Sequence, residues 1–407
     1  MTTALRRRVA LLGPAFIAAV AYVDPGNVAT NITAGAQFGY TLVWVIVLAN
    51  LMAVLVQYLS AKLGLVTQRS LAAQVGGRVS PRARVAYWLQ AEGIAIATDL
   101  AEVIGGAIAF HLLFGVPMPV GAVLTAVVAM GVLTIGDRLG QGALERVIVG
   151  FLLLIAVGFL AGLVVGPPSA SGIAGGLVPA FSGTESILLA SGIVGATVMP
   201  HAVYLHSSLT AGRLGSRGDR STVTELLAAT RTDVVLALLL AGVLNLALLL
   251  MAAANLNGLP GTDTIDGAHA LISSEIGAGV ALLFAVALLG SGISSTSVGS
   301  AAGAEVMRSL TPWNLAPVAR RLITLIPALV ILLAGIDPTR ALVVSQVVLS
   351  MGIPFAVVPL VWLTSSRAVM GRHVNRRSTT VAAVLAAAAI VALNVALLWL
   401  TFVPSGS

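Results

Sequence analysis

Residues 19–30 read AVAYVDPGNVAT, which places Asp24, Pro25, Gly26 and Asn27 in the middle of an apolar run. Proline removes a backbone hydrogen-bond donor and clashes with the preceding turn, while glycine favours unwinding. The pair predicts a helix that is interrupted at this point, with backbone groups freed beside an acidic side chain. At membrane depth such irregular backbone is tolerated only where it lines a cavity or is buried in protein.

A second interruption follows five apolar segments later, where residues 195–201 read GATVMPH. One proline alone is as well explained by a simple kink. Two interruptions in register, each flanked by polar groups, point instead to a binding site between inverted repeats of a transporter. The two stretches together therefore decide the expected fold.

The composition agrees with a chain embedded in lipid. Hydrophobic residues make up 58% of the 407 positions and charged residues only 9%, whereas soluble domains carry about 25% charged residues. No cysteine is present, which excludes disulfides and thiolate metal sites. A transition-metal site would have to use oxygen, imidazole or thioether ligands.

Stretches long and apolar enough to cross a bilayer define an all-α membrane protein with 11 transmembrane helices. They fall at about 11–36, 42–64, 86–113, 118–136, 146–166, 186–210, 233–256, 278–303, 321–335, 339–365 and 380–402. The first and the sixth contain the two breaks. Because five spans per repeat is an odd number, the second repeat is expected to be inverted in the membrane.

The predicted organisation is a 5+5 inverted repeat followed by one added helix. It comprises a cytoplasmic N-terminus (1–10), a first five-helix repeat (11–166), an external loop (167–185), a second five-helix repeat (186–365), a cytoplasmic loop (366–379), and an eleventh helix with an external C-terminus (380–407).

The basic residues set the orientation, because cytoplasmic loops carry an excess of Lys and Arg. Of the 22 basic residues, 21 lie at the N-terminus or beside an even-to-odd connection, and Arg340 is the exception. The N-terminus is therefore expected to be cytoplasmic. The net charge of +7 is a topology signal and gives no reason to expect a nucleic-acid partner.

The groups at the two breaks form a mixed ligand set. Asp24 offers a carboxylate, Asn27 an amide oxygen, Met199 a thioether, and Ala21 and Ala196 backbone carbonyls freed by unwinding. Oxygen ligands suit Mg²⁺ and Ca²⁺, whereas a thioether shifts preference toward softer transition metals. Mn²⁺ or Fe²⁺ is therefore the expected ion, although a gap-filling role in the core is the ordinary alternative for a methionine.

The chain resembles the Nramp family of proton-coupled metal transporters, especially its bacterial manganese members. The resemblance rests on Asp24-Pro-Gly-Asn27 and Met199-Pro-His201, and it extends over nearly the whole chain. Further matching segments are Gly13-Pro14-Ala15-Phe16, Ala97-Thr98-Asp99-Leu100-Ala101-Glu102, Tyr204-Leu205-His206-Ser207-Ser208, Asp337-Pro338-Thr339-Arg340 and Ser345-Gln346. One departure lies at Ala304 and Glu305, where the family commonly has Gln after the glycine, and this puts any coupling role of that expected loop in doubt.

The resemblance implies a leucine-transporter-like fold in the bacterial inner membrane, with the divalent metal as transported substrate and no cofactor. It implies that the protein is a transporter and not an enzyme. This transporter would take up metal ions together with protons, and no obligate protein partner is evident. It also implies that Asp24, Asn27, Met199 and the backbone at Ala21 and Ala196 hold the metal, with Gln346 approaching in some states.

A separate row of ionisable residues suggests a proton route. Glu92, Asp99 and Glu102 share one face of the third helix because their spacings are seven and three residues. Acids and imidazoles inside a membrane mark proton relays. We assign to this route Asp24, His201, Glu102, Asp99, Glu92, Arg320, Arg321 and His206. A structural hydrogen-bonding role is the stronger alternative for His206, and ion pairing in helix packing is an equal one for Glu92.

Three other functions fit less well. A sodium-coupled amino-acid symporter of the same fold would need a positive, glycine-rich break for the substrate carboxylate, and Asp24 opposes that. An ion channel would need a continuous pore, whereas matched interruptions favour alternating access. An intramembrane hydrolase would need paired catalytic groups, and no second membrane Asp is matched to Asp24 across the break.

Overall fold

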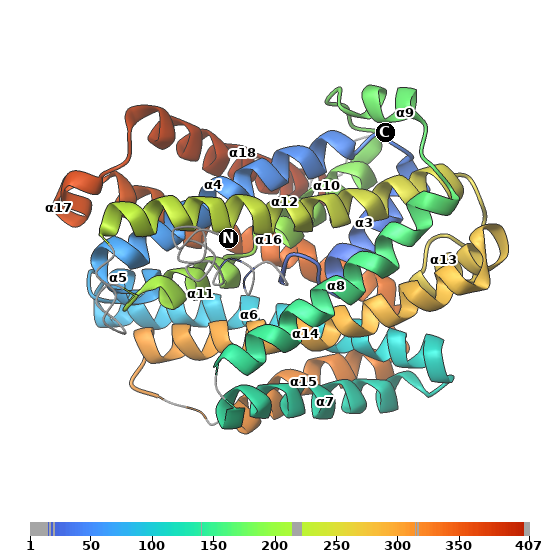
Figure 1. Cartoon of the computed structure of the whole chain (residues 1–407), viewed down its shortest axis with the longest axis horizontal. Helices are drawn as coiled ribbons and strands as arrows, with labels where there is room; N and C mark the ends of the chain where they lie inside the picture. The colour runs from blue at the N-terminus through green and yellow to red at the C-terminus, as the bar shows by residue number, and fades with distance from the viewer. Residues whose placement is uncertain are drawn as a thin grey trace, which may run out of the picture.

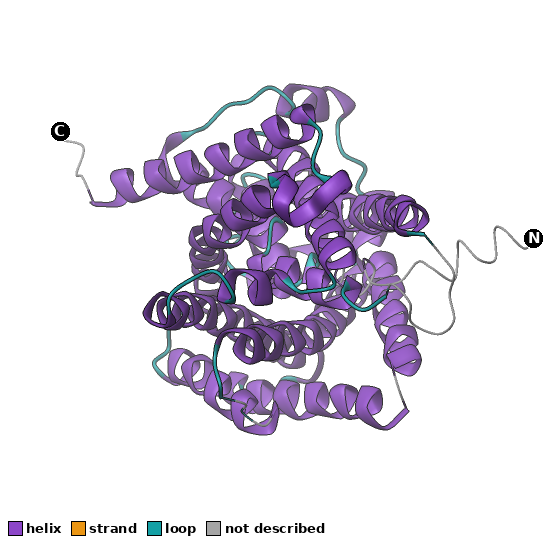
Figure 2. Ribbon diagram, turned by 90° about the vertical axis from the view of Figure 1, so that its left-hand side faces the viewer, coloured by secondary structure: helices purple, strands orange, loops and turns teal. Residues whose placement is uncertain are grey.

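The computed structural model describes Ala15, Ala18 and residues 21–139, 141–213, 222–313, 315 and 317–402. Within these ranges the side chains of residues 133, 135–139, 141–146, 148, 297, 317, 318, 321, 401 and 402 are outside the description. Every regular element in the described part is a helix, as Figure 2 shows. The prediction of an all-α membrane protein is therefore confirmed.

Helices cover ten of the eleven predicted spans completely or nearly so. In the first span, a helix covers the second half. The long elements are α3 (Pro25–Phe38), α4 (Val43–Thr67), α6 (Pro81–Phe114), α7 (Met118–Leu139), α8 (Gln141–Val165), α10 (Gly183–Thr197), α11 (Pro200–Thr210), α12 (Val223–Asn255), α14 (Ala278–Leu310), α15 (Pro317–Leu333), α16 (Pro338–Ser365) and α18 (Arg377–Phe402). Most of the first span before its break lies outside the described residues.

Short helices occupy several connections that the sequence analysis left without structure. These are α5 (Leu71–Gly76), α9 (Ala170–Gly176), α13 (Ile265–Leu271), the π-helical turn η2 (Ile272–Ile276), α17 (Arg367–Met370) and the 3₁₀ turn η3 (Gly371–His373). The side chains of Ser70, Ser169 and Thr264 accept a hydrogen bond from the first turn of α5, α9 and α13. These caps satisfy backbone donors that would otherwise be orphaned at the helix ends.

Several helices are longer than their apolar stretches. α12 begins ten residues before the predicted start, because Thr222 and Glu225 form a capping box upstream of the apolar run. α6 begins at Pro81, where the Ser80 side chain caps it. α14 continues to Leu310, so Ala304 and Glu305 lie inside this helix and not in a loop as expected.

Length and hydropathy identify seven helical segments of the described chain as able to cross a membrane, or eight if the bent pair α8 and α9 is one span. The broken pair α10 and α11 counts among them as one segment, Gly183–Thr210. α7 and α15 have shorter apolar portions, Met118–Val132 and Leu322–Leu333. The structure thus supports a multi-pass membrane protein, while the number of eleven crossings stays a prediction.

The long helices lie side by side along the longest axis of the molecule (Figure 1). α3 packs against α12, α10 and α16, while α6 packs against α14 and α16. α3, which begins at the first break, and α10, which ends at the second, are therefore enclosed by other helices. This position agrees with the rule that irregular backbone in a membrane must be covered by protein.

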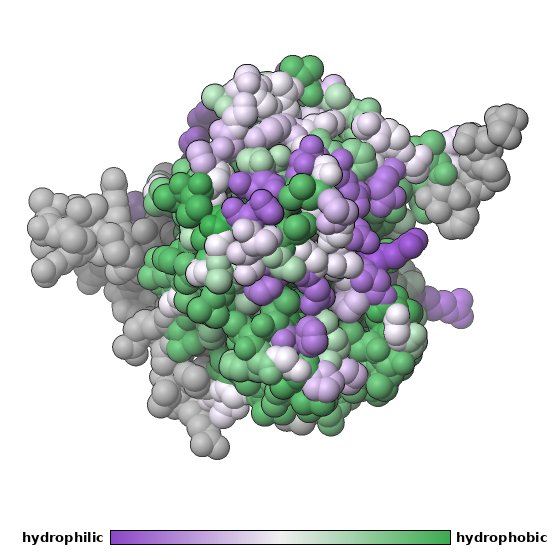
Figure 3. Space-filling model, turned by 90° about the vertical axis from the view of Figure 1, so that its right-hand side faces the viewer, coloured by the Kyte–Doolittle hydropathy of each residue, from purple (hydrophilic) through white to green (hydrophobic). Residues whose placement is uncertain are grey.

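Large apolar side chains are exposed along the outer helices, among them Leu51, Val127 and Leu385. Figure 3 looks onto one end of the bundle, where hydrophilic residues gather centrally and hydrophobic residues extend over the lower and left-hand sides. Apolar surface of this extent is expected of a chain whose flanks face lipid.

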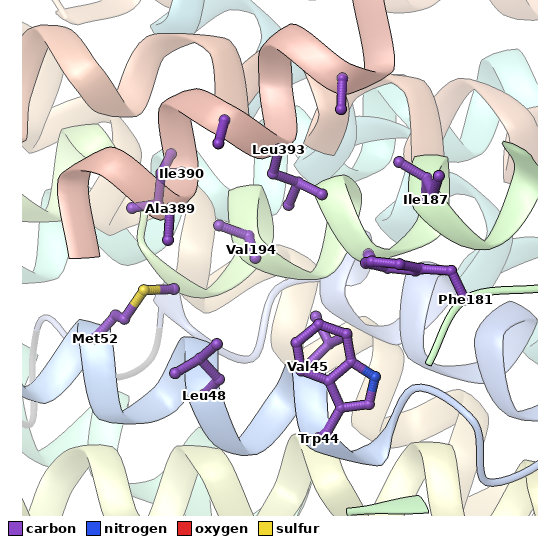
Figure 4. A pocket seen from close by; sticks show the side chains of 13 residues that line it. Trp44, Val45, Leu48, Met52, Phe181, Ile187, Val194, Ala389, Ile390 and Leu393 are labelled. Atoms are coloured by element: carbon purple, nitrogen blue, oxygen red, sulfur yellow. The ribbon is translucent and has the colours of Figure 1, made fainter. Parts of the chain in front are cut away.

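The last helix, α18, is fixed to the helices around the second break. The Asn394 side chain accepts hydrogen bonds from Ser191 Oγ of α10 (3.1 Å) and Ser350 Oγ of α16 (2.7 Å). It also donates to the Ser350 carbonyl (2.8 Å). Figure 4 shows the apolar groove beside this contact, where side chains of α18 face Leu48 and Met52 of α4 and Val194 of α10.

Candidate functional site

The first break is an N-cap built around Asp24. Residues 22–24 leave the helix, and α3 begins at Pro25, where the missing backbone donor costs nothing. The Asp24 carboxylate accepts a hydrogen bond from the Asn27 backbone N–H (2.8 Å). The positive end of the α3 dipole also favours a negative charge here. The Asp-Pro-Gly-Asn sequence thus both stops one helical segment and starts the next around a buried carboxylate.

Two neighbouring helices satisfy carbonyls that this break frees. Asn245 of α12 donates to the Tyr22 carbonyl (2.8 Å), and Ser291 of α14 donates to the Val23 carbonyl. Asn245 also accepts a hydrogen bond from Asn31 (3.1 Å). For Asn245 the sequence leaves two equal interpretations, cavity lining and helix packing, and it did not single out Ser291. The available signal was a polar side chain in each of two long apolar helices.

The second break separates α10, which ends at Thr197, from α11, which begins at Pro200. Met199 is the N-cap residue of α11, has an extended backbone and is fully buried. The carbonyl of Ala196 accepts a hydrogen bond from Asn27 Nδ2 (2.8 Å). The unwound backbone of the second half of the chain is therefore joined directly to the first break.

Asp24, Asn27, Ala196 and Gln346 meet at one place. Asn27 Nδ2 donates to both Asp24 Oδ1 and the Ala196 carbonyl, at 2.8 Å each. Gln346 of α16 lies with its Nε2 3.4 Å from Asp24 Oδ2. All four residues are buried, as is Ala21. The structure thus assembles four of the six predicted ligand residues by hydrogen bonds.

Two amide oxygens in this cluster have no hydrogen-bond partner among the residues that the structure describes. They are Asn27 Oδ1 and Gln346 Oε1, both buried. A buried acceptor without a donor costs about 1–3 kcal/mol. Carboxylate, amide and carbonyl oxygens are the ligand types that divalent cations use, so a cation bound here would relieve that cost. The donor set fits such an ion.

The close approach of α16 to the first break depends on Gly26. A Cβ atom at this position would overlap the amide group of the Gln346 side chain. Any larger residue would push Gln346 away from Asp24. Gly26 therefore serves two purposes, since it also weakens the helix at the break.

Two of the three acids of α6 are buried, and the third, Glu92, is partly buried. Asp99 and Glu102 are buried, and a Cβ at Gly299 of α14 would lie 3.0 Å from Glu102 Oε1 and 3.5 Å from Asp99 Oδ1. Glu92 pairs with Arg320 at 3.1 Å. The side chain of Arg321 lies outside the described part of the structure.

The two histidines of α11 have different surroundings. His201 Nδ1 is 3.3 Å from Thr98 Oγ1 of α6, and a cavity of about 10 Å³ lies between His201, Gln90 and Gly303. That volume suffices for about one water molecule. His206 Nδ1 is 2.7 Å from Gln57 Oε1, and Gln57 donates to the Tyr22 hydroxyl beside the first break. Gln57 thus links His206 to the break, a contact that the sequence did not predict.

Sequence reasoning also passed over Asp233. It is buried in α12 and accepts a hydrogen bond from the Ala15 backbone N–H (3.0 Å), before the first break. An acid within an apolar run was the signal that could have identified it. Lys62, which was counted among the loop cations, lies inside α4 and is buried.

The model of the Nramp family, described as natural resistance-associated macrophage protein-like, matches residues 15–400. A curated relative from Mycobacterium tuberculosis, named divalent metal cation transporter MntH, is 56% identical over 98% of this chain and 93% of its own length. A relative of the same name from Deinococcus radiodurans is 45% identical over 97% of this chain and 91% of its own length.

Solved structures show the same architecture. A manganese transporter of Eremococcus coleocola, in complex with an aromatic bis-isothiourea substituted compound, superposes with a TM-score of 0.86 at 32% identity. The alignment covers 100% of this chain and 90% of that one. Mhp1, a nucleobase-cation-symport-1 family transporter, has a TM-score of 0.61 at 16% identity over 95% of this chain and 89% of its own. This likeness confirms the predicted leucine-transporter-like fold.

The contact between Gly26 and Gln346 can be tested by a double-mutant cycle. We expect Gly26→Ala to lower the free energy of unfolding by about 1–3 kcal/mol, because the added methyl group overpacks the break. Gln346→Ala removes the group that the methyl meets, so the double variant should be destabilised by less than the sum of the two. Thermal unfolding in detergent measures the three variants.

Gly93→Ala is the matched control, because a Cβ there meets no neighbouring atom. Its stability should stay equal or rise slightly, by up to about 1 kcal/mol. Strictly additive effects of Gly26→Ala and Gln346→Ala would contradict the close approach of α16.

Proposed function

The chain belongs to the Nramp family, and on that premise we propose that it imports divalent transition-metal ions together with protons by alternating access. The family is one of transporters, so the protein is a transporter rather than an enzyme. The metal, Mn²⁺ or Fe²⁺, is then a substrate and not a cofactor. The observation that carries this proposal is the cluster in which Asn27 joins Asp24 to Ala196, while two amide oxygens there have no donor within the described ranges of the chain.

In the proposed site Asp24 supplies the negative charge that attracts the cation. The Asn27 NH₂ group lies between the Asp24 carboxylate and the Ala196 carbonyl, and an ion would compete with it for both acceptors. Turning the amide over would direct the unpaired Asn27 Oδ1 to the ion. Gln346 Oε1 is available in the same way from α16.

Selectivity is assigned to Met199. Its thioether is the one soft donor near the breaks, and soft donors favour transition metals over Ca²⁺ and Mg²⁺. The carbonyl of Ala21, at the end of the turn before the first break, completes the proposed ligand set.

Transport requires the helices around the breaks to move, because Asp24, Asn27 and Met199 are all buried. Residues 22–24 and 198–199, which lie between helical segments, are natural hinges. We propose that the protein lies in the bacterial inner membrane with a cytoplasmic N-terminus and an external C-terminus.

The proton route is assigned to the polar groups that lead away from Asp24. When the ion binds, Asp24 loses its proton, and His201, Asp99 and Glu102 receive or relay it. Glu92, on the same helix as the last two acids, pairs with Arg320 of α15, and Arg321 follows Arg320 in the sequence. The contact of His201 with Thr98 supports this route because it brings α11 to the acidic face of α6. His206 is linked to the first break through Gln57 and Tyr22.

The first test removes the charge at the break. We expect Asp24→Ala to abolish Mn²⁺ uptake into vesicles reconstituted with the protein, because the proposed site loses its only carboxylate. Asp263→Asn, a change to an exposed acid between α12 and α13, should leave uptake intact. Unimpaired uptake by Asp24→Ala would overturn the assignment.

The role of the thioether is tested by competition. With Met199→Ala, we expect Ca²⁺ and Mg²⁺ to inhibit Mn²⁺ uptake at several-fold lower concentrations than with the parent protein. Met251→Ala removes a buried methionine of α12 away from the breaks and should keep the parent profile. An unchanged competition profile in Met199→Ala would mean that its sulfur does not select the metal.

The proton route is tested by measuring two quantities on the same variants. Glu102→Gln and His201→Ala should reduce metal-driven proton entry, followed by a pH-sensitive dye inside the vesicles, more than they reduce Mn²⁺ binding. Glu275→Gln, at an exposed acid of η2, is the control. If binding and proton entry fell equally, these residues would belong to the metal site instead.

A further inference from the structure

A long groove lies between the second half of α16 and α18, where its lining extends from Thr380 to Val395. Its volume is about 910 Å³, near the upper end of the range of about 300–1,000 Å³ typical of ligand pockets. Apolar side chains form most of it, including Val358 and Trp362 of α16 and Val384, Ala388 and Val391 of α18. Both helices are long and apolar enough to cross the membrane, so this groove is open to hydrocarbon.

One end of the groove is polar. Ser365 and Ser366, where α16 ends, and Thr380, in the first turn of α18, line it there. The hydroxyl groups of Ser365 and Thr380 are 3.0 Å apart. The groove therefore changes from apolar to hydroxyl-lined toward the connection between the two helices.

That connection carries a cluster of positive charge. Its four arginines are all exposed: Arg367, Arg372, Arg376 and Arg377. Arg376 and Arg377 lie one turn before Thr380, whose backbone N–H donates to the Arg376 carbonyl (3.0 Å). The sequence contains no Asp or Glu after Asp337, and no carboxylate of the described residues forms an ion pair with these arginines.

The arginine cluster is held in place by Asn375. The Asn375 backbone N–H donates to the Thr364 carbonyl (3.0 Å), and its amide donates to the Thr364 hydroxyl (2.9 Å). Lys62 of α4, which is buried, donates to Asn375 Oδ1 (2.8 Å) and ties this connection to α4. Partial burial, together with the charges of Arg372 and Lys62, lowers the pKa of the neighbouring His373. The backbone that carries the arginines is thus fixed to the end of α16, close to the hydroxyl-lined end of the groove.

We propose that this groove binds an anionic glycerophospholipid, with an acyl chain between α16 and α18 and the phosphate against the arginine cluster. An apolar body that ends in hydroxyls and then in uncompensated cations matches the three parts of such a lipid. Basic pockets between transmembrane helices bind anionic headgroups in this way. The proposed lipid site is independent of the metal site.

The groove on the opposite side of α18 is the natural comparison (Figure 4). It has a volume of about 310 Å³ and its lining residues include Trp44 and Leu48 of α4 and Ile390 and Leu393 of α18. All of the described residues that line it are apolar or aromatic, without an ionisable group. An acyl chain there would have no partner for a charged headgroup, so this groove should not prefer anionic lipids.

Native mass spectrometry of the full chain in an uncharged detergent tests the charge preference. The probes are phosphatidylglycerol and phosphatidylcholine with identical acyl chains. We expect phosphatidylglycerol to be retained in preference. Each arginine near the headgroup contributes about a fivefold effect, so Arg376→Gln with Arg377→Gln should reduce that preference about 25-fold. Arg340→Gln, an exposed arginine at the other end of α16, should not change it.

Two adjacent alanines test the groove itself. Ala388→Trp should fill it and reduce phosphatidylglycerol retention, whereas Ala389→Trp, which points into the opposite groove, should preserve that retention. Equal retention of both lipids by the parent protein would overturn the proposal. So would equal effects of the two tryptophans, which would indicate headgroup binding on the surface alone. Displacement of the lipid by inorganic phosphate would likewise overturn it, since it would indicate a simple anion site.

Discussion

The fold depends on one constraint: backbone groups freed inside a membrane-embedded bundle must find partners within the protein. Residues 22–24 and 198–199 leave their helices in the interior. Asn245 and Ser291 satisfy carbonyls of the first break, and Asn27 satisfies the Ala196 carbonyl beside the second. Four helices in addition to α3 and α10 are thereby committed to positions around the breaks, namely α11, α12, α14 and α16.

The same requirement produces the candidate site. Asn27 bridges Asp24 and Ala196 through its Nδ2, and its own Oδ1 is buried without a hydrogen-bond donor among the described residues. Gln346 is in a similar position, since its Nε2 faces Asp24 and no donor in the described part of the chain reaches its Oε1. Oxygens that are costly without a partner are useful where a cation is to be held and released. The groups that stabilise the breaks are thus also the groups proposed to bind the metal.

Polar side chains surround the site on several different sides. On one side, Asp99 and Glu102 of α6 face α14, and Glu92 of α6 pairs with Arg320 of α15. On another side, His206 of α11 pairs with Gln57 of α4. α18 adds a third connection, because Asn394 joins it to both α10 and α16. A lipid between α16 and α18 would therefore contact a helix that supplies Gln346.

The sequence by itself determined the helical class and the two breaks, and it named Asp24, Asn27 and Met199 as the residues proposed to hold the metal. Hydrophobic stretches and the pair of breakers Pro and Gly are local features, and local features can be read without knowing the fold. The start of α12 was predicted less well, because a capping box placed it upstream of the apolar run.

Only the tertiary structure decided which distant groups complete the breaks. Gln346 is 322 residues from Asp24, and Asn245 is 223 residues from Tyr22. Whether such amides meet a break or merely pack depends on helix rotation and crossing, which long apolar helices with little amphipathic character do not encode locally. Three other features likewise could not be predicted, because each depends on how separate helices pack in the fold. They are the pairing of Lys62 with Asn375, the burial of Asp233 and the groove between α16 and α18.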